Sequence, residues 1–378
     1  MKIGACDKVN VVHLLSGGNV GGIETLCKDF ALHSVQHNTF LFLWEGGAVA
    51  DEMLQCGIDV VQPGSNRKQY IALYKKVRDI CREKKADVVI AHHADPFSHF
   101  ALMRLKREYP SLGTVAYAHG NAADMCRARR KVLSLAKKIL LKRSLNRADR
   151  IVAISESVRE SLLTDLGVSR SKTEVVYNGV DASRFYPAEG NAFPVRQWIY
   201  VGRLIEEKGV QEILKALARL KDIDYCFSIA GDGPYRKELQ KLADELGISG
   251  RVKFLGVRRD VPDLLRQSGI FLHMPVWEEG FGITVVEAMA SGLICVCAGT
   301  GALPEIIEDG KSGYLVKEAN SDALAAKLRE ITALSEDEKQ RIRNQAAERA
   351  KFFSVERFTA HLDRLITEVR GTETESKI

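Results

Sequence analysis

Short apolar runs and amphipathic segments alternate along the first half of the chain. The apolar runs are typical of buried strands and are expected at residues 10–15, 39–44, 59–62, 86–92, 114–118, 150–154 and 172–177. Apolar residues at helical spacing fall between them, at residues 23–35, 69–85, 97–109, 127–147 and 157–167. Because strands that alternate with helices form parallel sheets, this half predicts a doubly wound α/β domain.

A second series of the same kind follows the turn-rich segment Tyr186–Pro194, which we interpret as a linker. Its strands are expected at residues 197–201, 225–230, 251–255, 269–274, 293–297 and 313–316. Its helices are expected at residues 210–220, 235–247, 261–267, 283–290, 303–307 and 322–334. The pattern predicts two tandem Rossmann-like domains, residues 1–186 and 187–353.

The chain is expected to end in helices over residues 337–352 and 354–370 and a polar, flexible tail over 371–378. The helix over 354–370 is expected to pack back on the N-terminal domain. In doubly wound sheets the ligand binds beyond the carboxyl ends of the strands. We therefore expect the two domains to face each other across a cleft that holds the functional site.

Composition narrows the class of protein. The 378 residues are 46% hydrophobic and 28% charged, an ordinary globular balance, and no apolar run approaches the ~20 residues of a membrane span. The N-terminus lacks a signal-peptide core, so we expect a cytoplasmic protein. The eight cysteines are scattered, and Cys295 and Cys297 lie in an apolar run that favours a buried strand over a metal site. A net charge of +6 permits anionic partners without specifying one.

The glycine-rich turn within Pro275–Gly292 carries the most specific local chemistry. Gly280 and Gly282 lie between an expected strand and a helix that begins near Ile283, and such a helix start can bind an anion. Glu279 and Glu287 frame the turn and would suit sugar hydroxyls better than phosphate. The alternative is a loop with two solvated glutamates.

A second loop supplies positive charge. Arg203 and Lys208 lie in Val201–Gly209, directly after the first strand of the second domain. Two fixed cations near a helix start can neutralise a diphosphate and stabilise a leaving group that gains negative charge. The alternative is a solvated basic pair.

Other strand ends give weaker signals. The segment after the first strand is dense in glycine but lacks the dinucleotide-binding spacing, so Gly17, Gly18, Gly21 and Gly22 indicate either close approach to a ligand or a plain loop. A lone histidine more often has a structural role, but His119 follows a strand and precedes a glycine, which moves it towards a site role. Backbone groups after two further strands, at Gly231 and Val257, could contact a nucleotide base.

Several motifs together resemble the family 4 retaining glycosyltransferases of the two-Rossmann-domain (GT-B) type. In the second half they are Gly202-Arg-Leu-Ile-Glu-Glu-Lys-Gly209, Gly231-Asp-Gly-Pro234, Phe254-Leu-Gly256 and Glu279-Gly-Phe-Gly282 with Glu287 beyond it. In the first half they are Gly21-Gly-Ile-Glu24, Ala118-His-Gly120, Ile154-Ser-Glu-Ser157 and Asn178-Gly-Val-Asp181. The match covers most of residues 10–370. It departs at Val276 and at Gly301-Ala-Leu-Pro-Glu305, and neither departure removes a charged group from the expected site.

The resemblance implies a retaining, metal-independent hexosyltransferase that uses a nucleotide sugar as donor. It implies catalytic roles for Arg203, Lys208, Glu279 and His119: the two cations hold the donor diphosphate, and the other two residues contact the transferred sugar. The implied donor-binding set is Gly21, Gly22, Gly202, Arg203, Lys208, Gly231, Val257, Glu279, Gly280, Phe281, Gly282, Ile283 and Glu287. No cofactor and no metal ligand are expected.

Residues 127–150 are strongly basic, with ten cations against the single acid Asp149. The cations are Arg127, Arg129, Arg130, Lys131, Lys137, Lys138, Lys142, Arg143, Arg147 and Arg150. Apolar residues at helical spacing separate them, which is typical of a basic amphipathic helix that lies on anionic lipid. The alternative is a helix that faces the core and solvates its basic side. Nucleic acid is not expected, because no aromatic surface accompanies the charges.

The sequence therefore predicts a transferase that moves a sugar from a nucleotide sugar, with uridine diphosphate as the expected carrier, to a saccharide or lipid-linked saccharide of the cell envelope. It can associate with the inner face of the membrane. Two alternatives stay open: a nucleotide-sugar-binding subunit without turnover, and an epimerase or phosphorylase on the same fold. Acceptor specificity is expected to rest on N-terminal loops such as Ser65–Gln69.

Overall fold

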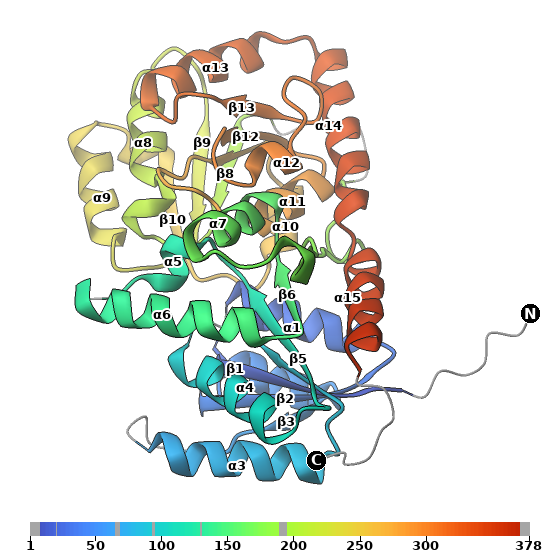
Figure 1. The fold of residues 1–378 in the computed structure, drawn as a ribbon. Coiled ribbons are helices and arrows are strands. Elements are labelled where there is room, and N and C mark those ends of the chain that lie inside the picture. Colours follow the sequence, from blue (N-terminus) through green and yellow to red (C-terminus); the bar gives the residue numbers. More distant parts are fainter. Residues whose placement is uncertain are drawn as a thin grey trace, which may run out of the picture. The chain divides into compact units, whose positions relative to one another are not determined.

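The computed structural model describes residues 8–19, 21–64, 69–92, 95–128, 131–188 and 195–370. Most of the expected linker, most of the loop Ser65–Gln69 and the tail after residue 370 lie outside these residues. The described chain forms two compact units (Figure 1). Unit 1 contains the residues up to Gly179 and those from Val355 onward, and unit 2 is Val180–Ser354.

Unit 1 is built on a parallel sheet of seven strands in the order β3-β2-β1-β4-β5-β6-β7. The strands are β1 (Asn10–Gly17), β2 (His37–Glu45), β3 (Asp59–Val61), β4 (Val88–Ala91), β5 (Gly113–Ala118), β6 (Arg150–Ala153) and β7 (Thr173–Val175). The order reverses between β1 and β4, whose register pairs Leu14 with Ala91. This reversal is the switch point at which doubly wound sheets bind ligands.

The helices of unit 1 flank this sheet. They are α1 (Gly22–His33), α2 (Ala48–Gln55), α3 (Tyr70–Glu83), α4 (Pro96–Glu108), α5 (Ala122–Cys126), α6 (Lys131–Arg147), α7 (Glu156–Leu166) and α15 (Val355–Val369). Although α15 ends the described chain, it packs on α1 and β5. Asp363 accepts hydrogen bonds from Ser34 Oγ at 2.7 Å and from the Val35 N–H at 3.1 Å, and Arg364 pairs with Glu174 at 2.6 Å.

Unit 2 is built on a parallel sheet of six strands in the order β10-β9-β8-β11-β12-β13. The strands are β8 (Gln197–Val201), β9 (Cys226–Ala230), β10 (Val252–Gly256), β11 (Ile270–His273), β12 (Ile294–Ala298) and β13 (Tyr314–Val316). The helices are α8 (Val210–Ala218), α9 (Arg236–Glu245), α10 (Val261–Arg266), α11 (Ile283–Ala290), α12 (Leu303–Ile306), α13 (Ser321–Ala333) and α14 (Glu336–Ala350). Here the switch point lies between β8 and β11.

The structure corrects the predicted elements around α5 and α6. The periodic pattern predicted one helix over residues 127–147, but Arg127 is extended, with φ −61° and ψ 132°, and caps the short helix α5. The basic helix α6 begins at Lys131, so Arg127 precedes it, while Arg150 belongs to β6. Arg129 and Arg130 lie outside the described residues. Helices α2, of eight residues, and α5, of five residues, were not predicted.

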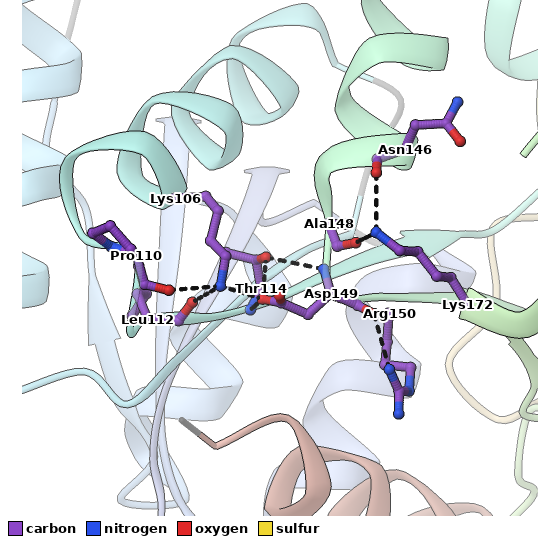
Figure 2. Close-up of polar contacts among 9 residues, drawn as sticks. All are labelled: Lys106, Pro110, Leu112, Thr114, Asn146, Ala148, Asp149, Arg150 and Lys172. Carbon is purple, nitrogen blue, oxygen red and sulfur yellow. Dashed lines mark hydrogen bonds and ion pairs between the residues drawn. The ribbon is translucent and has the colours of Figure 1, made fainter. Parts of the chain in front are cut away.

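A polar cluster fixes the turn that follows α6 (Figure 2). Asp149 accepts hydrogen bonds from the Thr114 N–H at 2.9 Å and from Thr114 Oγ1 at 2.7 Å, and it pairs with Lys106 at 2.8 Å. Lys172 donates to the carbonyls of Asn146 and Ala148 at the end of the helix. The C-terminal end of α6 is therefore anchored to β5, to α4 and to Lys172, the residue before β7.

Candidate active site

The switch point of unit 2 brings together loops that are far apart in the sequence. Strands β8 and β11 are neighbours in the sheet, and their register pairs Trp198 with Ile270. The loop after β8 carries Arg203 and Lys208, and the loop after β11 carries Glu279. Because the carboxyl ends of parallel strands meet at one edge, the loops converge there.

The turn at Gly209 holds the two loops in contact. Gly209 has φ +68° and stands between the short 3-10 helix Glu206–Lys208 and α8. A Cβ atom added to Gly209 would lie 1.6 Å from the Met274 carbonyl oxygen, so only glycine fits this approach. The Val276 N–H donates to the Glu207 carbonyl at 3.0 Å, which joins the same loops a second time.

Glu279 lies between two nitrogen groups. Its Oε2 atom is 2.6 Å from Lys208 Nζ and 3.0 Å from His273 Nε2. Burial by itself raises the pKa of the Glu279 carboxyl, but the Lys208 charge and the His273 hydrogen bond outweigh it and hold this pKa well below its usual range. Glu279 is therefore an ionised, oriented carboxylate with only 12% of its side chain exposed.

His273 is a site residue that sequence reasoning missed. It ends β11, is buried, and its Nδ1 atom has no hydrogen-bond partner among the described residues. Burial lowers the pKa of His273 although Glu279 raises it, so the ring is neutral near pH 7 and donates to Glu279 through Nε2. The available signal was a single polar residue in an otherwise apolar strand, two residues before Pro275.

The glycine turn places a helix start beside this carboxylate. Gly282 has φ +90° and precedes α11, whose first residue is Ile283, as the sequence predicted. The first N–H groups of a helix have no partner inside it and carry the positive end of the helix dipole. Gly301 packs on the Glu279 backbone, where an added Cβ would lie 2.3 Å from the Glu279 carbonyl oxygen, and Ala302 N–H donates to that oxygen at 2.9 Å.

Gly280, Phe281 and Glu287, the other residues predicted in this turn, differ in burial. Gly280 is half-buried, whereas Phe281 is buried and its ring packs edge-on to Phe353 at 5.7 Å. Glu287 is half-buried on α11, one turn beyond Ile283. Phe281 can therefore contact a ligand through its backbone and not through its side chain.

Arg203 emerges from a turn that a buried tyrosine shapes. The Arg203 side chain is exposed, while its carbonyl accepts a hydrogen bond from Tyr200 OH at 3.1 Å. Gly202 has φ +157°, and a Cβ there would lie 2.7 Å from the same hydroxyl. Burial, reinforced by the Glu279 charge, raises the pKa of Tyr200, so its phenol stays protonated and fixes the Arg203 backbone.

Gly231 and Val257 lie on the β9 and β10 side of the switch point. Gly231 has φ +140°, and an added Cβ would lie 1.9 Å from the Gly202 carbonyl oxygen, so packing between adjacent strand ends already requires glycine there. Val257 follows the edge strand β10 and is 67% exposed. The strand order β10-β9-β8 separates Val257 from the Arg203 loop by one strand.

The predicted residues of unit 1 follow the carboxyl ends of β1 and β5, which are the two strands on either side of β4. Gly21 caps α1 in an extended conformation, and Gly22 begins the helix, where an added Cβ would meet no atom within 4 Å. His119 follows β5, is half-buried, and lies with its Nε2 atom 3.2 Å from Nδ1 of His92. Its ring stacks on Tyr117 with centroids 4.2 Å apart.

Cys295 and Cys297, which the sequence presented as a possible metal site, lie in the core of unit 2. Cys295 and Cys297 are buried in β12, which confirms the predicted core strand. Burial raises the pKa of both thiols, so they stay protonated. Across the described part of the chain, no group of three or more His, Cys, Asp or Glu residues is arranged to hold a metal ion.

The unit 2 switch point thus combines an exposed arginine, a lysine paired with an ionised glutamate, and a helix start. Cations and backbone N–H groups bind phosphate, whereas carboxylates accept hydrogen bonds from hydroxyls. The arrangement suits a ligand that carries both groups.

Both halves of the chain match family models of glycosyltransferases. Residues 191–349 match the family model described as "Glycosyl transferases group 1", and residues 20–184 match the one described as "Glycosyltransferase Family 4". An uncharacterized glycosyltransferase of Methanocaldococcus jannaschii is 28% identical over 75% of both chains. The N-acetyl-alpha-D-glucosaminyl L-malate synthase of Bacillus anthracis is 23% identical over 82% of this chain and 81% of its own.

Solved structures agree on the fold. The Anabaena HepE structure in complex with UDP and glucose superposes with a TM-score of 0.83 at 22% identity, covering 95% of this chain and 99% of its own. WaaG, a glycosyltransferase involved in lipopolysaccharide biosynthesis, superposes with a TM-score of 0.74 at 17% identity, covering 94% and 99%. The predicted fold of two Rossmann-like domains of the GT-B type is confirmed.

Proposed function

Because the chain belongs to the group 1 glycosyltransferases of family 4, we propose that it transfers a hexosyl group, with retention, from a uridine diphosphate sugar to a saccharide or lipid-linked saccharide. The observation that carries the proposal is the convergence of Arg203, the Lys208–Glu279 pair and the α11 start at one switch point. The choice of uridine is supported by HepE, whose structures contain UDP and UDP-glucose.

The proposed roles follow from the charges. Arg203 and Lys208 neutralise the diphosphate as it departs, and the N–H groups at the start of α11 contribute positive potential. Glu287 accepts from the ribose, while Glu279, with the backbone from Gly280 to Ile283, binds hydroxyls of the transferred sugar. Gly21, Gly22 and His119 of unit 1 act on the donor from their own switch point.

Substitutions at the switch point test these roles. Removing a group that stabilises the leaving diphosphate typically costs ~10²-fold in rate, so Arg203→Ala should lower turnover of a working donor at least about tenfold. We expect a fall of the same size for Glu287→Ala, which removes the proposed ribose contact. Arg196→Ala is the matched control, because Arg196 precedes β8 at its opposite end and pairs with Asp224 at 2.7 Å. Normal turnover in Arg203→Ala would contradict the site.

The donor and the mechanism need separate measurements. We expect UDP and UDP-sugars to raise the melting temperature more than GDP or ADP, since a ligand at 100 times its dissociation constant stabilises by ~2.7 kcal/mol. Proton NMR of the product should show the anomeric configuration of the donor. We propose that the transfer needs no metal, so activity should persist in EDTA; an inverted product or loss of activity in EDTA would refute the corresponding point.

We further propose that α6 rests on anionic membrane lipid. Its buried residues, Leu141, Ser144 and Leu145, lie in the anchored C-terminal half. The N-terminal half exposes apolar side chains, with Val132 78% and Leu135 60% exposed, between lysines such as Lys131 and Lys138. A helix that faced the core would bury these apolar residues. None of the described helices is long and apolar enough to cross a membrane.

Vesicle binding tests this proposal. The protein should sediment with vesicles that contain phosphatidylglycerol and not with pure phosphatidylcholine. Lys138→Ser should weaken binding about fivefold, since each cation near such a surface contributes ~1 kcal/mol. Val132→Ser with Leu135→Ser should abolish binding, whereas Ile71→Ser, an equally exposed change on α3, should not. Equal sedimentation with both vesicle types would contradict the proposal.

A further inference from the structure

Three histidines on adjacent strands of unit 1 form a hydrogen-bonded chain. His13 lies in β1, His92 follows β4 and His119 follows β5, and these strands are neighbours in the order β2-β1-β4-β5. His13 Nδ1 is 2.8 Å from His92 Nε2, and His92 Nδ1 is 3.2 Å from His119 Nε2. The far end is Asn38 in β2, whose Oδ1 lies 2.9 Å from His13 Nε2.

Asn38 gives this chain a direction. Its Nδ2 donates to Ser34 Oγ at 3.0 Å and to the Gln36 carbonyl at 3.2 Å. A carbonyl oxygen can only accept, so the amide nitrogen must face Gln36, and Oδ1 must face His13. His13 Nε2 therefore carries a hydrogen and donates it to Asn38.

His13 holds only that one hydrogen. The ring is fully buried, and burial lowers the pKa of His13 to about 4, although the Asn38 hydrogen bond raises it. At neutral pH His13 Nδ1 is therefore an acceptor, and His92 Nε2 must donate to it.

The same reasoning passes through His92. His92 is buried, which disfavours a second hydrogen on its ring, so its Nδ1 accepts. The Cys27 thiol lies 3.7 Å from this nitrogen and 3.9 Å from Nε2, and burial raises the pKa of Cys27, so the thiol stays protonated and is a weak donor beside the ring. His119 Nε2 must then donate to His92.

We propose that Asn38, His13 and His92 are positioning residues that fix the tautomer of His119, with the hydrogen on Nε2 and Nδ1 as the accepting nitrogen. Tyr117 supports the arrangement by stacking on the His119 ring. The functional consequence rests on the role proposed above for His119: towards the donor sugar, His119 accepts a hydrogen bond through Nδ1.

Histidine NMR of the full chain tests the tautomer directly. Two-bond nitrogen–proton spectra of protein labelled with ¹⁵N-histidine distinguish the Nε2–H from the Nδ1–H form, and His119→Gln assigns the signal. We expect His119 of the wild type to be the Nε2–H form at neutral pH. An Nδ1–H form would overturn the proposal.

Two variants break the chain at different points. His13→Phe removes the acceptor for His92 and keeps a ring that can stack on Phe40. In the wild type the centroids of the His13 and Phe40 rings are 4.3 Å apart. Asn38→Leu keeps all three histidines and removes the fixed acceptor, together with the Asn38 hydrogen bonds to Ser34 and Gln36, so it is the second variant if His13→Phe does not fold. Both should give His119 a mixture of tautomers, whereas His33→Phe, outside the chain, should not. An unchanged His119 signal in both chain variants would overturn the proposal.

Kinetics separate this proposal from the proposed function. A wrong tautomer in a catalytic triad can cost up to ~10⁴-fold in rate, so we expect kcat of Asn38→Leu to fall roughly tenfold or more while KM for the donor changes little. If the variants shift the tautomer but His119→Ala keeps normal turnover, the proposed role of His119 in transfer is wrong and the proposal for the histidine chain is supported. If His119→Ala is inactive but neither variant changes the tautomer, the proposal for the histidine chain is wrong and the proposed role of His119 in transfer is supported.

Discussion

Buried histidines in otherwise apolar strands set the polar geometry of both units. His13 in β1 orients a chain that ends at His119, and His273 in β11 holds Glu279 through Nε2. Both rings are neutral near pH 7, because burial lowers the pKa of each. A neutral imidazole has one donor and one acceptor, so each ring transmits a defined hydrogen-bond direction.

Because the His13 pKa is about 4 in the folded chain, against an ordinary 6.5, stability should depend on pH in this window. Between the two values the unfolded chain binds a proton that the folded chain does not, so stability is full above pH 6.5 and falls as pH drops towards 4. The His13 contribution to this fall is up to about 3 kcal/mol. Urea unfolding of His13→Phe should show a correspondingly smaller loss between pH 7 and pH 4.5.

The exposed His37 provides the control for this measurement. His37→Phe should lose stability with falling pH as the wild type does. A His13→Phe protein with the full wild-type dependence would show that other groups account for the acid sensitivity.

Residue types in the candidate site were predictable, but their partners were not. Arg203, Lys208, Glu279 and Glu287 stood out because charged residues at strand ends beside glycine turns have few structural uses. The ion pair between Lys208 and Glu279 joins residues 71 positions apart, and no local pattern encodes it. His13 and His273 were overlooked because the hydrogen-bond partners that give each ring its role, Asn38 and Glu279, are known only from the fold.

At the scale of elements, the turn at Gly209 determines how the two loops of unit 2 meet. Gly209→Ala should cost more than the ~1 kcal/mol of a left-handed conformation, because its Cβ would also overlap the Met274 carbonyl. Relief of that overlap must move Lys208 away from Glu279. We expect lower thermal stability together with weaker protection by UDP in a thermal-shift assay.

Gly247 is a matched control for this substitution. It has the same φ of +68°, but an added Cβ would meet no atom within 4 Å. Gly247→Ala should therefore cost only ~1 kcal/mol and leave UDP protection unchanged. If the two variants behave alike, contact between the loops does not limit the site.

The bounds of some elements were predicted correctly, whereas those of others were not. Helix α11 was predicted with its observed bounds, since a glycine turn and Ser291-Gly292 delimit its apolar pattern. The helix predicted over residues 127–147 began too early, because cations alone do not indicate where a helix starts, whereas its predicted end at Arg147 is the observed one. Its start depends on the extended backbone at Arg127, and its end on the Asp149 contacts in Figure 2.

At the scale of the whole molecule, the chain leaves unit 1, builds unit 2 and returns to unit 1 with its last helix. Residues from Val355 belong to unit 1, and α15 buries Phe358, Leu362, Leu365 and Ile366. Amphipathic spacing predicted this helix, but only the three-dimensional contacts identify α1 and β5 as the surface it covers. The stability of unit 1 therefore depends on residues encoded after unit 2.

This interleaving predicts that a core substitution in α15 weakens unit 1 selectively. Leu362 is 1% exposed, and Leu362→Ala should destabilise unit 1 by about 2–5 kcal/mol through lost burial and a residual cavity. In hydrogen exchange, β1, β4 and β5 should lose protection while β8 and β11 keep theirs. Leu328→Ala in α13, a fully buried leucine of unit 2, should give the opposite pattern. If Leu362→Ala instead weakened both sheets equally, the two units would unfold as one cooperative body, and α15 would stabilise the molecule as a whole.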